Sequence, residues 1–314
     1  MTKPLLRAAV LETILVALGA VLAVASPAFL TVDNLLNVLR NVSMQGLIAL
    51  GMTMVIIAGE IDLSVGSMVA FAGCLTAYIA GGLSGLGIGT SITIAIITTI
   101  AAGALLGSFS GLMRTKYQVP TFITTLALMT GLTGVAELIT NGFPLTPFPS
   151  WYNFLGGGHL FGIPFPAIVF LAAFAVVLVV MNHTGFGRSV YAVGGNAEAA
   201  RLSGIDVARV KIAVLAITSG LAALSGVMQS SEIMSGTATT AKGWELDVIA
   251  AVIIGGTSLM GGVGRVWGTM VGVVFLGVII NGMTLLNISE YWQHVVRGAL
   301  ILTAVLINRF QPRA

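Results

Sequence analysis

The sequence predicts an all-α, polytopic integral membrane protein with about ten transmembrane helices, some of them short or discontinuous. Two observations carry this prediction. Of the 314 residues, 57% are strongly apolar and only 8% are charged, whereas charged residues make up about 25% of a soluble domain. Each crossing of a bilayer takes roughly 20 mostly apolar residues, so about ten crossings leave room only for short loops and tails. The chain is therefore expected to form a single transmembrane domain over residues 1–314, which excludes a soluble enzyme.

Apolar runs and the breaks between them place these helices in order along the chain. The spans expected in the first half are residues 8–25, 42–59, 64–80, 88–113 and 119–140. Those expected in the second half are residues 165–181, 210–228, 247–260, 266–286 and 294–307, of which 247–260 is too short to cross a full bilayer as a straight helix. The first span also has features of a cleavable secretory signal, because an Ala-Val-Ala tripeptide ends the run at Ala25. Glu12 lies within that run, so we expect residues 1–25 to be retained.

The cations divide unequally between the two sides of the membrane if the chain crosses it an even number of times. Eleven of the 14 Lys and Arg residues then share one side, namely Lys3, Arg7, Arg114, Lys116, Arg188, Arg201, Arg209, Lys211, Arg265, Arg309 and Arg313. The other side receives Arg40, Lys242 and Arg297. By the positive-inside rule, both termini are expected in the cytoplasm. The cations form no cluster, so no nucleic-acid partner is expected.

The longest loop on the cytoplasmic side, residues 182–209, contains the pattern of a short capped helix. Asn196 is a residue type that caps helix N-termini, Glu198 lies in the first turn where the helix dipole favours an anion, and Gly204 suits a left-handed C-terminal position. A rigid helix on a cytoplasmic loop can transmit a movement from a soluble motor protein to the membrane domain. The alternative interpretation of this pattern is a loop helix that lies on the lipid headgroups. The residues expected to couple the membrane domain to such a partner are Asn196, Glu198, Arg201, Gly204 and Asp206.

Two polar, glycine-rich interruptions break apolar runs, one in each half of the chain. Residues 59–64 follow the second predicted span, and residues 252–264 interrupt a short apolar run in the second half. Irregular backbone is tolerated in a membrane only where it is buried in protein or lines water, and paired interrupted helices in two halves of a transporter point to a central pathway. The first interruption is either a turn at the membrane edge or a wall of that pathway. The candidate pathway residues are Asp62, Ser64, Thr257, Ser258 and Asn281.

The remaining small and polar residues indicate helix packing and give no sign of a catalytic or metal-binding site. Glycines at 103, 107 and 111 and at 264, 268 and 272 recur every fourth residue, the spacing that lets helix backbones approach closely. Cys74, the one cysteine, lies in an apolar run and is expected to be a packing residue. The three histidines are far apart, and no phosphate-binding glycine loop or hydrolase triad can be assembled. No catalytic residue, metal site or cofactor is therefore expected.

Three long motifs resemble the permease subunits of ribose-, xylose- and galactose-type bacterial ABC sugar importers. They are residues 51–68, residues 191–211 and residues 245–269, the last followed by Asn281-Gly282. Within the second motif, Glu198-Ala199-Ala200 and Gly204 are similar to the EAA-x-x-x-G signature of the loop that contacts the ATP-binding subunit.

This resemblance implies a multi-pass inner-membrane permease that moves a monosaccharide or a similar small polar solute into the cytoplasm. It implies three partners: a cytoplasmic ABC ATPase with two nucleotide-binding halves, a periplasmic or extracellular sugar-binding protein, and a second permease copy. ATP hydrolysis would then occur in the partner subunit, and the permease itself would be no enzyme. Candidate residues for docking the binding protein are Glu232, Lys242, Glu245 and Asp247.

One departure from the family pattern leaves the solute and the energy source open. Glu60 stands where family members usually have Gly or Ser, so a polyol, a deoxysugar or another neutral polar solute is an alternative substrate. The alternative function is a proton- or sodium-coupled secondary transporter in which Glu60, Asp62 or Glu137 is the coupling acid.

Overall fold

The computed structural model describes residues 3–310, and within them the side chains of residues 10–303 and of Leu306. Of the cations assigned to the cytoplasmic side, Lys3, Arg7, Arg309 and Arg313 lie outside these described side chains.

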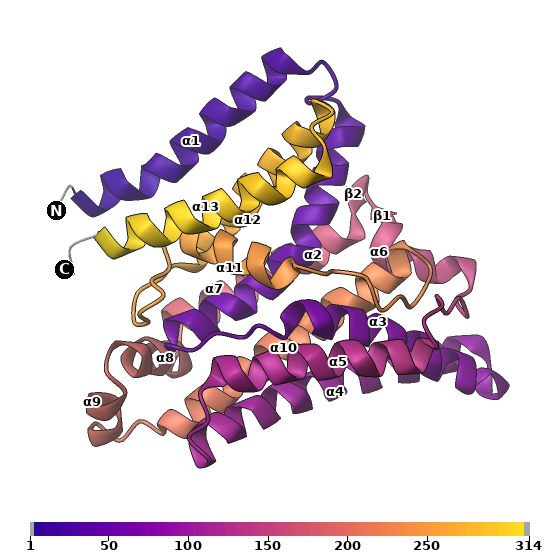
Figure 1. Ribbon diagram of the computed structural model, residues 1–314, viewed down its shortest axis with the longest axis horizontal. Helices are drawn as coiled ribbons and strands as arrows, with labels where there is room; N and C mark the ends of the chain where they lie inside the picture. Colours follow the sequence, from indigo (N-terminus) through magenta and orange to yellow (C-terminus); the bar gives the residue numbers. More distant parts are fainter. Residues whose placement is uncertain (1–2, 311–314) are drawn as a thin grey trace.

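The described chain is almost entirely helical (Figure 1). Its longer helices are α1 (Lys3–Ala25), α2 (Val32–Ile57), α3 (Val65–Gly82), α4 (Ile88–Lys116), α5 (Thr121–Thr140), α7 (Phe165–His183), α8 (Gly185–Gly195), α10 (Val207–Glu232), α11 (Trp244–Ile254), α12 (Val266–Leu285) and α13 (Glu290–Phe310). The short elements are the 3-10 helices η1 (Ser84–Leu86) and η2 (Ser150–Asn153), the helices α6 (Phe154–Gly157) and α9 (Ala197–Leu202), and the antiparallel strands β1 (His159–Leu160) and β2 (Ile163–Pro164).

Seven described helices are long and apolar enough to cross a membrane, by length and composition: α2, α3, α4, α5, α7, α10 and α12. Each of the three other expected spans overlaps a helix as well. Residues 8–25 lie in α1, residues 294–307 lie in α13, and the short run 247–260 overlaps α11 (Trp244–Ile254) over residues 247–254. Each of the ten expected spans therefore overlaps a helix, but residues 255–260 of the expected span 247–260 form a loop after the short helix α11.

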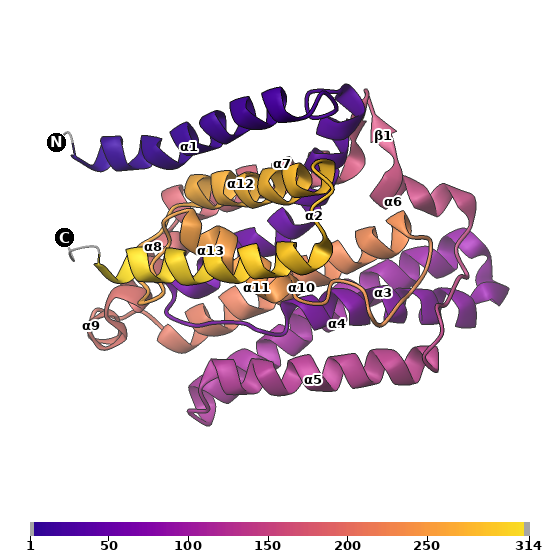
Figure 2. The same ribbon diagram turned by 45° about the horizontal axis from the view of Figure 1, so that its top comes forward.

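The core is built around α2 and α10, which contact most of the other helices. Figures 1 and 2 show α1, α12 and α13 on one side of these two helices and α4 and α5 on the other. Almost every residue of α2 from Val42 to Ile57 is buried, because neighbouring helices surround that half. The glycines at 103, 107 and 111 on α4 lie against α10, where a Cβ at Gly103 would come within 2.8 Å of the Ser219 carbonyl oxygen. The predicted packing role of these glycines is thus confirmed.

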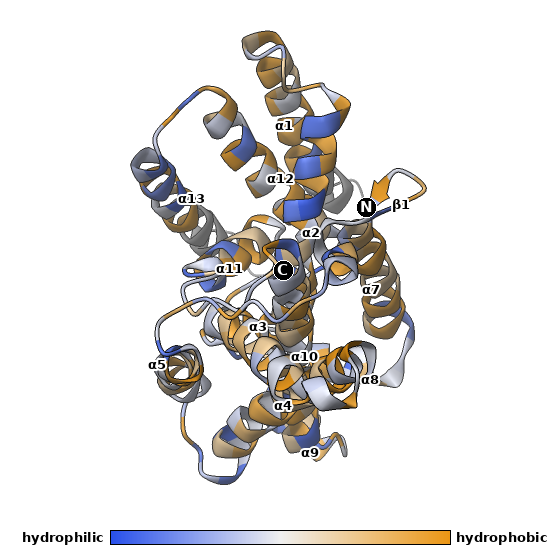
Figure 3. Ribbon diagram, turned by 90° about the vertical axis from the view of Figure 1, so that its right-hand side faces the viewer, coloured by the Kyte–Doolittle hydropathy of each residue, from blue (hydrophilic) through white to orange (hydrophobic). Residues whose placement is uncertain are grey.

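Two ends of the molecule can be distinguished along its long axis. The first turns of α1, the last turns of α13, and the helices α8 and α9 lie together at one end, named here the α9 end (Figures 1 and 2). The helix α6 and the strands β1 and β2 lie at the other end, named the α6 end. Figure 3 views the molecule from the α6 end and shows hydrophilic residues on α2 and α13 there, whereas α7 is mostly apolar.

Candidate coupling and translocation sites

The short helix expected on the loop 182–209 is present as α9, at the α9 end. The Asn196 side-chain oxygen accepts a hydrogen bond of 3.0 Å from the Ala199 amide, which caps the helix. Gly204 follows the helix with a φ of 84°, in the left-handed region that a side chain would strain. Both predicted helix signals are confirmed by this geometry.

Glu198 and Arg201 form an ion pair of 2.6 Å on the outer face of α9, and both side chains are about two-thirds exposed. The Arg201 guanidinium holds the pKa of the Glu198 carboxyl below its ordinary value, so the pair stays charged at neutral pH. An exposed pair contributes little to stability. Its two charges are accessible to another protein.

Asp206 caps the next helix, α10. Its carboxylate accepts a hydrogen bond of 3.0 Å from the Arg209 amide and pairs with the Arg209 guanidinium at 3.0 Å. All five residues expected to couple therefore lie on one continuous segment, from Asn196 to Asp206.

A contact between three glycine-rich backbone segments joins this region to the membrane helices. The Gly262 amide donates a hydrogen bond of 2.8 Å to the Ile57 carbonyl at the end of α2. A Cβ at Gly194 would overlap that same carbonyl oxygen and would lie 2.6 Å from the Gly262 nitrogen. The Tyr191 hydroxyl donates to the Gly264 carbonyl at 3.0 Å. We name residues 57–59, 194–195 and 261–264 together the glycine junction.

The glycine junction places the end of α8 against both helix interruptions. Residues 57–59 of the junction begin the interruption between α2 and α3. Residues 261–264 of the junction belong to the loop between α11 and α12. The sequence does not predict this contact, because the pairs Gly194-Gly195 and Gly261-Gly262 indicate a helix end and a turn but not that the two meet. The repeated Gly-Gly pattern was the available signal.

Glu60 lies in the first interruption and is almost fully buried, with 6% of its side chain exposed. The Arg114 guanidinium donates to one carboxylate oxygen at 2.8 Å, and the Lys211 ammonium donates to the same oxygen. The Thr121 hydroxyl donates to the other oxygen at 2.6 Å. Glu60 thus ties the interruption to α4, α5 and α10 at the α9 end.

Asp62 and Ser64 satisfy the backbone that this interruption frees. One oxygen of the buried Asp62 carboxylate accepts hydrogen bonds from the Ser64 amide at 2.8 Å and from the Ser64 hydroxyl at 2.6 Å. The Ser219 hydroxyl on α10 donates to the other oxygen at 3.4 Å, and the Thr125 hydroxyl accepts a bond of 3.1 Å from the Leu63 amide. The irregular backbone is therefore buried in protein, one of the two conditions under which a membrane tolerates it.

Thr257 and Ser258 lie in the second interruption, between α11 and α12. Thr257 is buried, and the Ser258 amide donates to the Val263 carbonyl at 2.9 Å, which closes the loop on itself. The Thr53 and Thr269 hydroxyls form a hydrogen bond of 2.6 Å that links α2 to α12 beside this loop.

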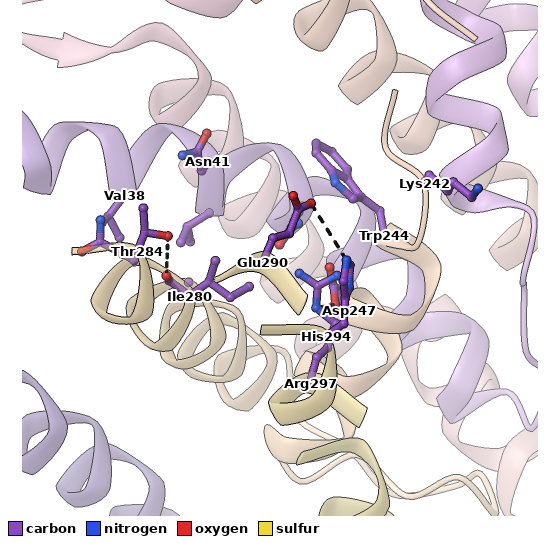
Figure 4. Close-up of a pocket in the computed structure, with 14 residues that line it drawn as sticks. Val38, Asn41, Lys242, Trp244, Asp247, Ile280, Thr284, Glu290, His294 and Arg297 are labelled. Carbon is purple, nitrogen blue, oxygen red and sulfur yellow. Dashed lines mark hydrogen bonds and ion pairs between the residues drawn. The ribbon is translucent and has the colours of Figure 1, made fainter. Parts of the chain in front are cut away.

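Asn281 lies at the opposite end of α12 and lines a cavity of about 390 Å³ (Figure 4). Its amide exchanges hydrogen bonds of 3.0 and 2.7 Å with the Asn34 amide on α2. Lys242 and Asp247, which the sequence assigned to docking, line the same cavity. Asp247 forms an ion pair of 2.7 Å with Arg297 of α13.

The two other docking candidates lie outside this cavity and contact their own chain. Glu232, at the end of α10, lies 3.9 Å from Arg40 of α2. The Glu245 carboxylate lies against Gly66 at the start of α3. Among the described residues, no group of three or more His, Cys, Asp or Glu side chains is placed to hold a metal ion.

The structure therefore gathers the coupling candidates on one segment but separates the pathway candidates into three places. Asp62 and Ser64 are buried against α10, Thr257 and Ser258 lie beside the glycine junction, and Asn281 lines the cavity at the α6 end.

A bundle of membrane-length helices with paired interruptions and an exposed capped helix at one end is the architecture of a membrane transport subunit. A family model described as the permease component of the branched-chain amino acid transport system matches residues 34–305, and the chain belongs to this family. The expectations of a helical multi-pass permease, and of a transport subunit rather than an enzyme, are confirmed by this membership.

Individual relatives cover nearly the whole chain. It is similar to the ribose import permease protein RbsC of Bacillus subtilis (strain 168), with 43% identity over 291 residues that cover 92% of this chain and 88% of the relative. It is also similar to RbsC of Escherichia coli (strain K12), with 41% identity over 302 residues, 94% of this chain and 91% of the relative. The L-arabinose ABC transporter permease protein AraH of Azospirillum brasilense is 35% identical over 294 residues, 94% of this chain and 85% of the relative. No solved structure matches the chain.

Proposed function

We propose that the chain is the permease subunit of an ATP-driven importer that moves a monosaccharide, of the pentose class, into the cytoplasm. The observation that carries the coupling part of this proposal is the glycine junction, which connects the exposed segment Asn196–Asp206 to both helix interruptions through α8. The substrate class is supported by relatives that are named for ribose and for L-arabinose.

The position of Glu60 removes the reason to expect a different solute. Although it departs from the family pattern, it is held by Arg114, Lys211 and Thr121 at the α9 end. It does not line the cavity at the α6 end. These contacts support a structural role for Glu60, in which the change from Gly or Ser leaves the groups that contact the solute unaltered.

In the proposed mechanism, a cytoplasmic ATPase with two nucleotide-binding halves grips α9 through Glu198 and Arg201. When the ATPase closes, α9 and α8 move as one unit, because Asn196 both ends α8 and caps α9. The close packing at Gly194 passes this displacement to the end of α2 and to the loop before α12. The two interruptions then change the inner side of the pathway that Thr257 and Ser258 border.

The remaining partners and the orientation follow from the same proposal. A second copy of this chain completes the membrane domain, and an external sugar-binding protein delivers the solute at the α6 end, where Lys242 is exposed. The α9 end is cytoplasmic, as are both termini in the multi-pass inner-membrane protein. Arg114, Arg201 and Lys211 lie at the α9 end, which agrees with the positive-inside rule.

The surroundings of Glu60, Asp62 and Glu137, the candidate coupling acids, weigh against an ion-coupled carrier. Two cations hold Glu60, and hydrogen bonds from Ser64 and Ser219 occupy both oxygens of Asp62. Glu137 is exposed on α5. Neither the ion-paired Glu60 nor the exposed Glu137 is arranged to exchange protons or sodium ions during transport.

The coupling assignment can be tested by co-purification of the tagged permease with the ATPase of its transporter. We expect the double variant Glu198→Lys plus Arg201→Glu to lose association and stimulated ATP hydrolysis while its level in the membrane is unchanged. Arg188→Gln is a matched control, because Arg188 is an exposed cation on α8 outside the capped segment. Intact association and intact solute uptake in the double variant would refute the coupling role of α9.

A further inference from the structure

The cavity at the α6 end has a volume in the range of small-molecule binding sites. It measures about 390 Å³, and such sites occupy about 300–1,000 Å³. Its walls come from four helices: α2, α11, α12 and α13. Figure 4 shows Trp244, Asp247, His294 and Arg297 grouped at one end of it, with Ile280 and Thr284 at the other.

The lining is rich in groups that both donate and accept hydrogen bonds. Asn41, Gln45 and Asn281 contribute side-chain amides, and Thr284 contributes a hydroxyl. Hydroxyl groups of a ligand also donate and accept, so these side chains are complementary to a polyhydroxylated molecule. Trp244 adds an apolar ring face, which suits the C–H face of a sugar ring, and an N–H donor at its edge.

The charges that line the cavity favour a neutral ligand. Lys242 and Arg297 offset Asp247 and Glu290, so the lining carries no formal net charge when His294 is neutral. Asp247 is 97% buried, and the 2.7 Å approach of its oxygen to the Arg297 nitrogen is not aligned as a hydrogen bond. Both of these atoms are enclosed by protein, so the pair holds α11 to α13 in the cavity wall and leaves the wall without an uncompensated charge.

Three of the four wall helices also reach the glycine junction or the loop that forms it. The junction begins at Ile57, the last residue of α2, and its third segment lies between the end of α11 and the start of α12. A ligand in the cavity therefore touches helices that lead to the glycine junction, where the end of α8 meets them. The cavity mouth, where Asn41, Glu290 and His294 are exposed, lies at the α6 end.

From these observations we infer that the cavity is a solute-binding site of the permease itself, for a neutral, polyhydroxylated molecule of monosaccharide size. The inference rests on the proposed function and adds that the permease, and not only its binding protein, recognises the sugar. A branched-chain amino acid, which the family description names, is the competing ligand, because Val38, Val42 and Ile280 also line the cavity.

Thiol labelling of the purified permease, without binding protein or ATPase, tests this site directly. The native Cys74 is buried, so Asn41→Cys supplies an accessible thiol at the cavity mouth. With D-ribose at about nine times its dissociation constant, we expect a water-soluble maleimide to react about tenfold more slowly. Phe161→Cys, at a position 94% exposed at the same end of the molecule, is the matched control and should react at an unchanged rate.

A second substitution distinguishes binding in the cavity from a general effect of the sugar. In the Asn41→Cys background, Trp244→Ala should raise the ribose concentration that gives half protection by about tenfold. Trp151→Ala, which removes an exposed indole at the α6 end outside the cavity, should leave that concentration unchanged. Size-exclusion profiles confirm that each variant is folded.

Two results would overturn the inference: unchanged labelling at saturating ribose and L-arabinose, or protection by L-leucine but not by either sugar. Either result would leave the proposed function standing if the wild-type permease, reconstituted with its partners, still takes up pentose with ATP. Absence of that uptake would instead refute the proposed function.

Discussion

At the scale of single residues, the two most informative positions are Gly194 and Glu60. Gly194 lets the backbone of α8 reach the carbonyl of Ile57, a contact that any larger residue would obstruct. Glu60 forms ion pairs with two cations, the nearly buried Lys211 and the partly exposed Arg114. The sequence shows Glu60 as unusual but does not single out Gly194, and it cannot show the partners of either, because Ile57 and Gly194 are distant along the chain and so are Glu60 and Lys211.

We expect Gly194→Ala to destabilise the permease and to uncouple ATP hydrolysis from uptake. The added methyl group would overlap the Ile57 carbonyl oxygen, and forced overpacking typically costs about 1–3 kcal/mol. Thermal unfolding in detergent and the ratio of solute transported to ATP hydrolysed measure the two effects. Gly195→Ala is the neighbouring control, because a Cβ there meets nothing within 4 Å. Equal behaviour of the two variants would show that the junction is not closely packed.

We expect Glu60→Ala to lower the free energy of unfolding by about 3–5 kcal/mol, because it leaves Arg114 and Lys211 without their buried counter-ion. Adding Lys211→Met should recover part of the loss. Unfolding in mixed micelles checks both values. A Glu60→Ala permease of normal stability that no longer transports would instead make Glu60 a functional acid.

At the scale of elements, local signals predict helices well and their approach to one another poorly. The cap at Asn196 and the left-handed turn at Gly204 are properties of a few adjacent residues, so the sequence identifies α9 correctly. The start of α2 is ten residues earlier than the expected span at 42, because Thr31 caps a polar first half that contains Asp33 and Arg40. An apolar-run criterion cannot detect such a polar helical extension.

The cap of α9 gives a prediction at this scale. Asn196→Ala should weaken the binding of the ATPase, since losing an N-cap costs a helix about 1 kcal/mol, whereas Asn196→Asp keeps an oxygen that can accept from the Ala199 amide. Titration of the ATPase against each permease variant in nanodiscs measures the two affinities. If the two substitutions weaken binding equally, the cap does not matter and the side chain itself makes the contact.

At the scale of the whole molecule, α2, α11 and α12 connect the polar cavity at the α6 end to the glycine junction at the α9 end. The sequence predicts the helical architecture, the two interruptions and the coupling segment. It does not predict the cavity, because Asn41, Trp244, Asn281 and Arg297 come from four helices that only the folded chain brings together. It also separated Asn281 from Asp247 by assigning one to the pathway and the other to docking, although both line that cavity.

The central claim is that ATP hydrolysis in a partner, transmitted through α9, drives inward movement of a pentose through this chain. The most direct measurement is the uptake of labelled ribose and arabinose into proteoliposomes that contain the permease, its ATPase and its binding protein, with proton and sodium gradients collapsed. We expect uptake that requires ATP and is lost in the Glu198→Lys plus Arg201→Glu variant. Uptake that continues without ATP, and that stops only when an ion gradient is removed, would contradict the claim.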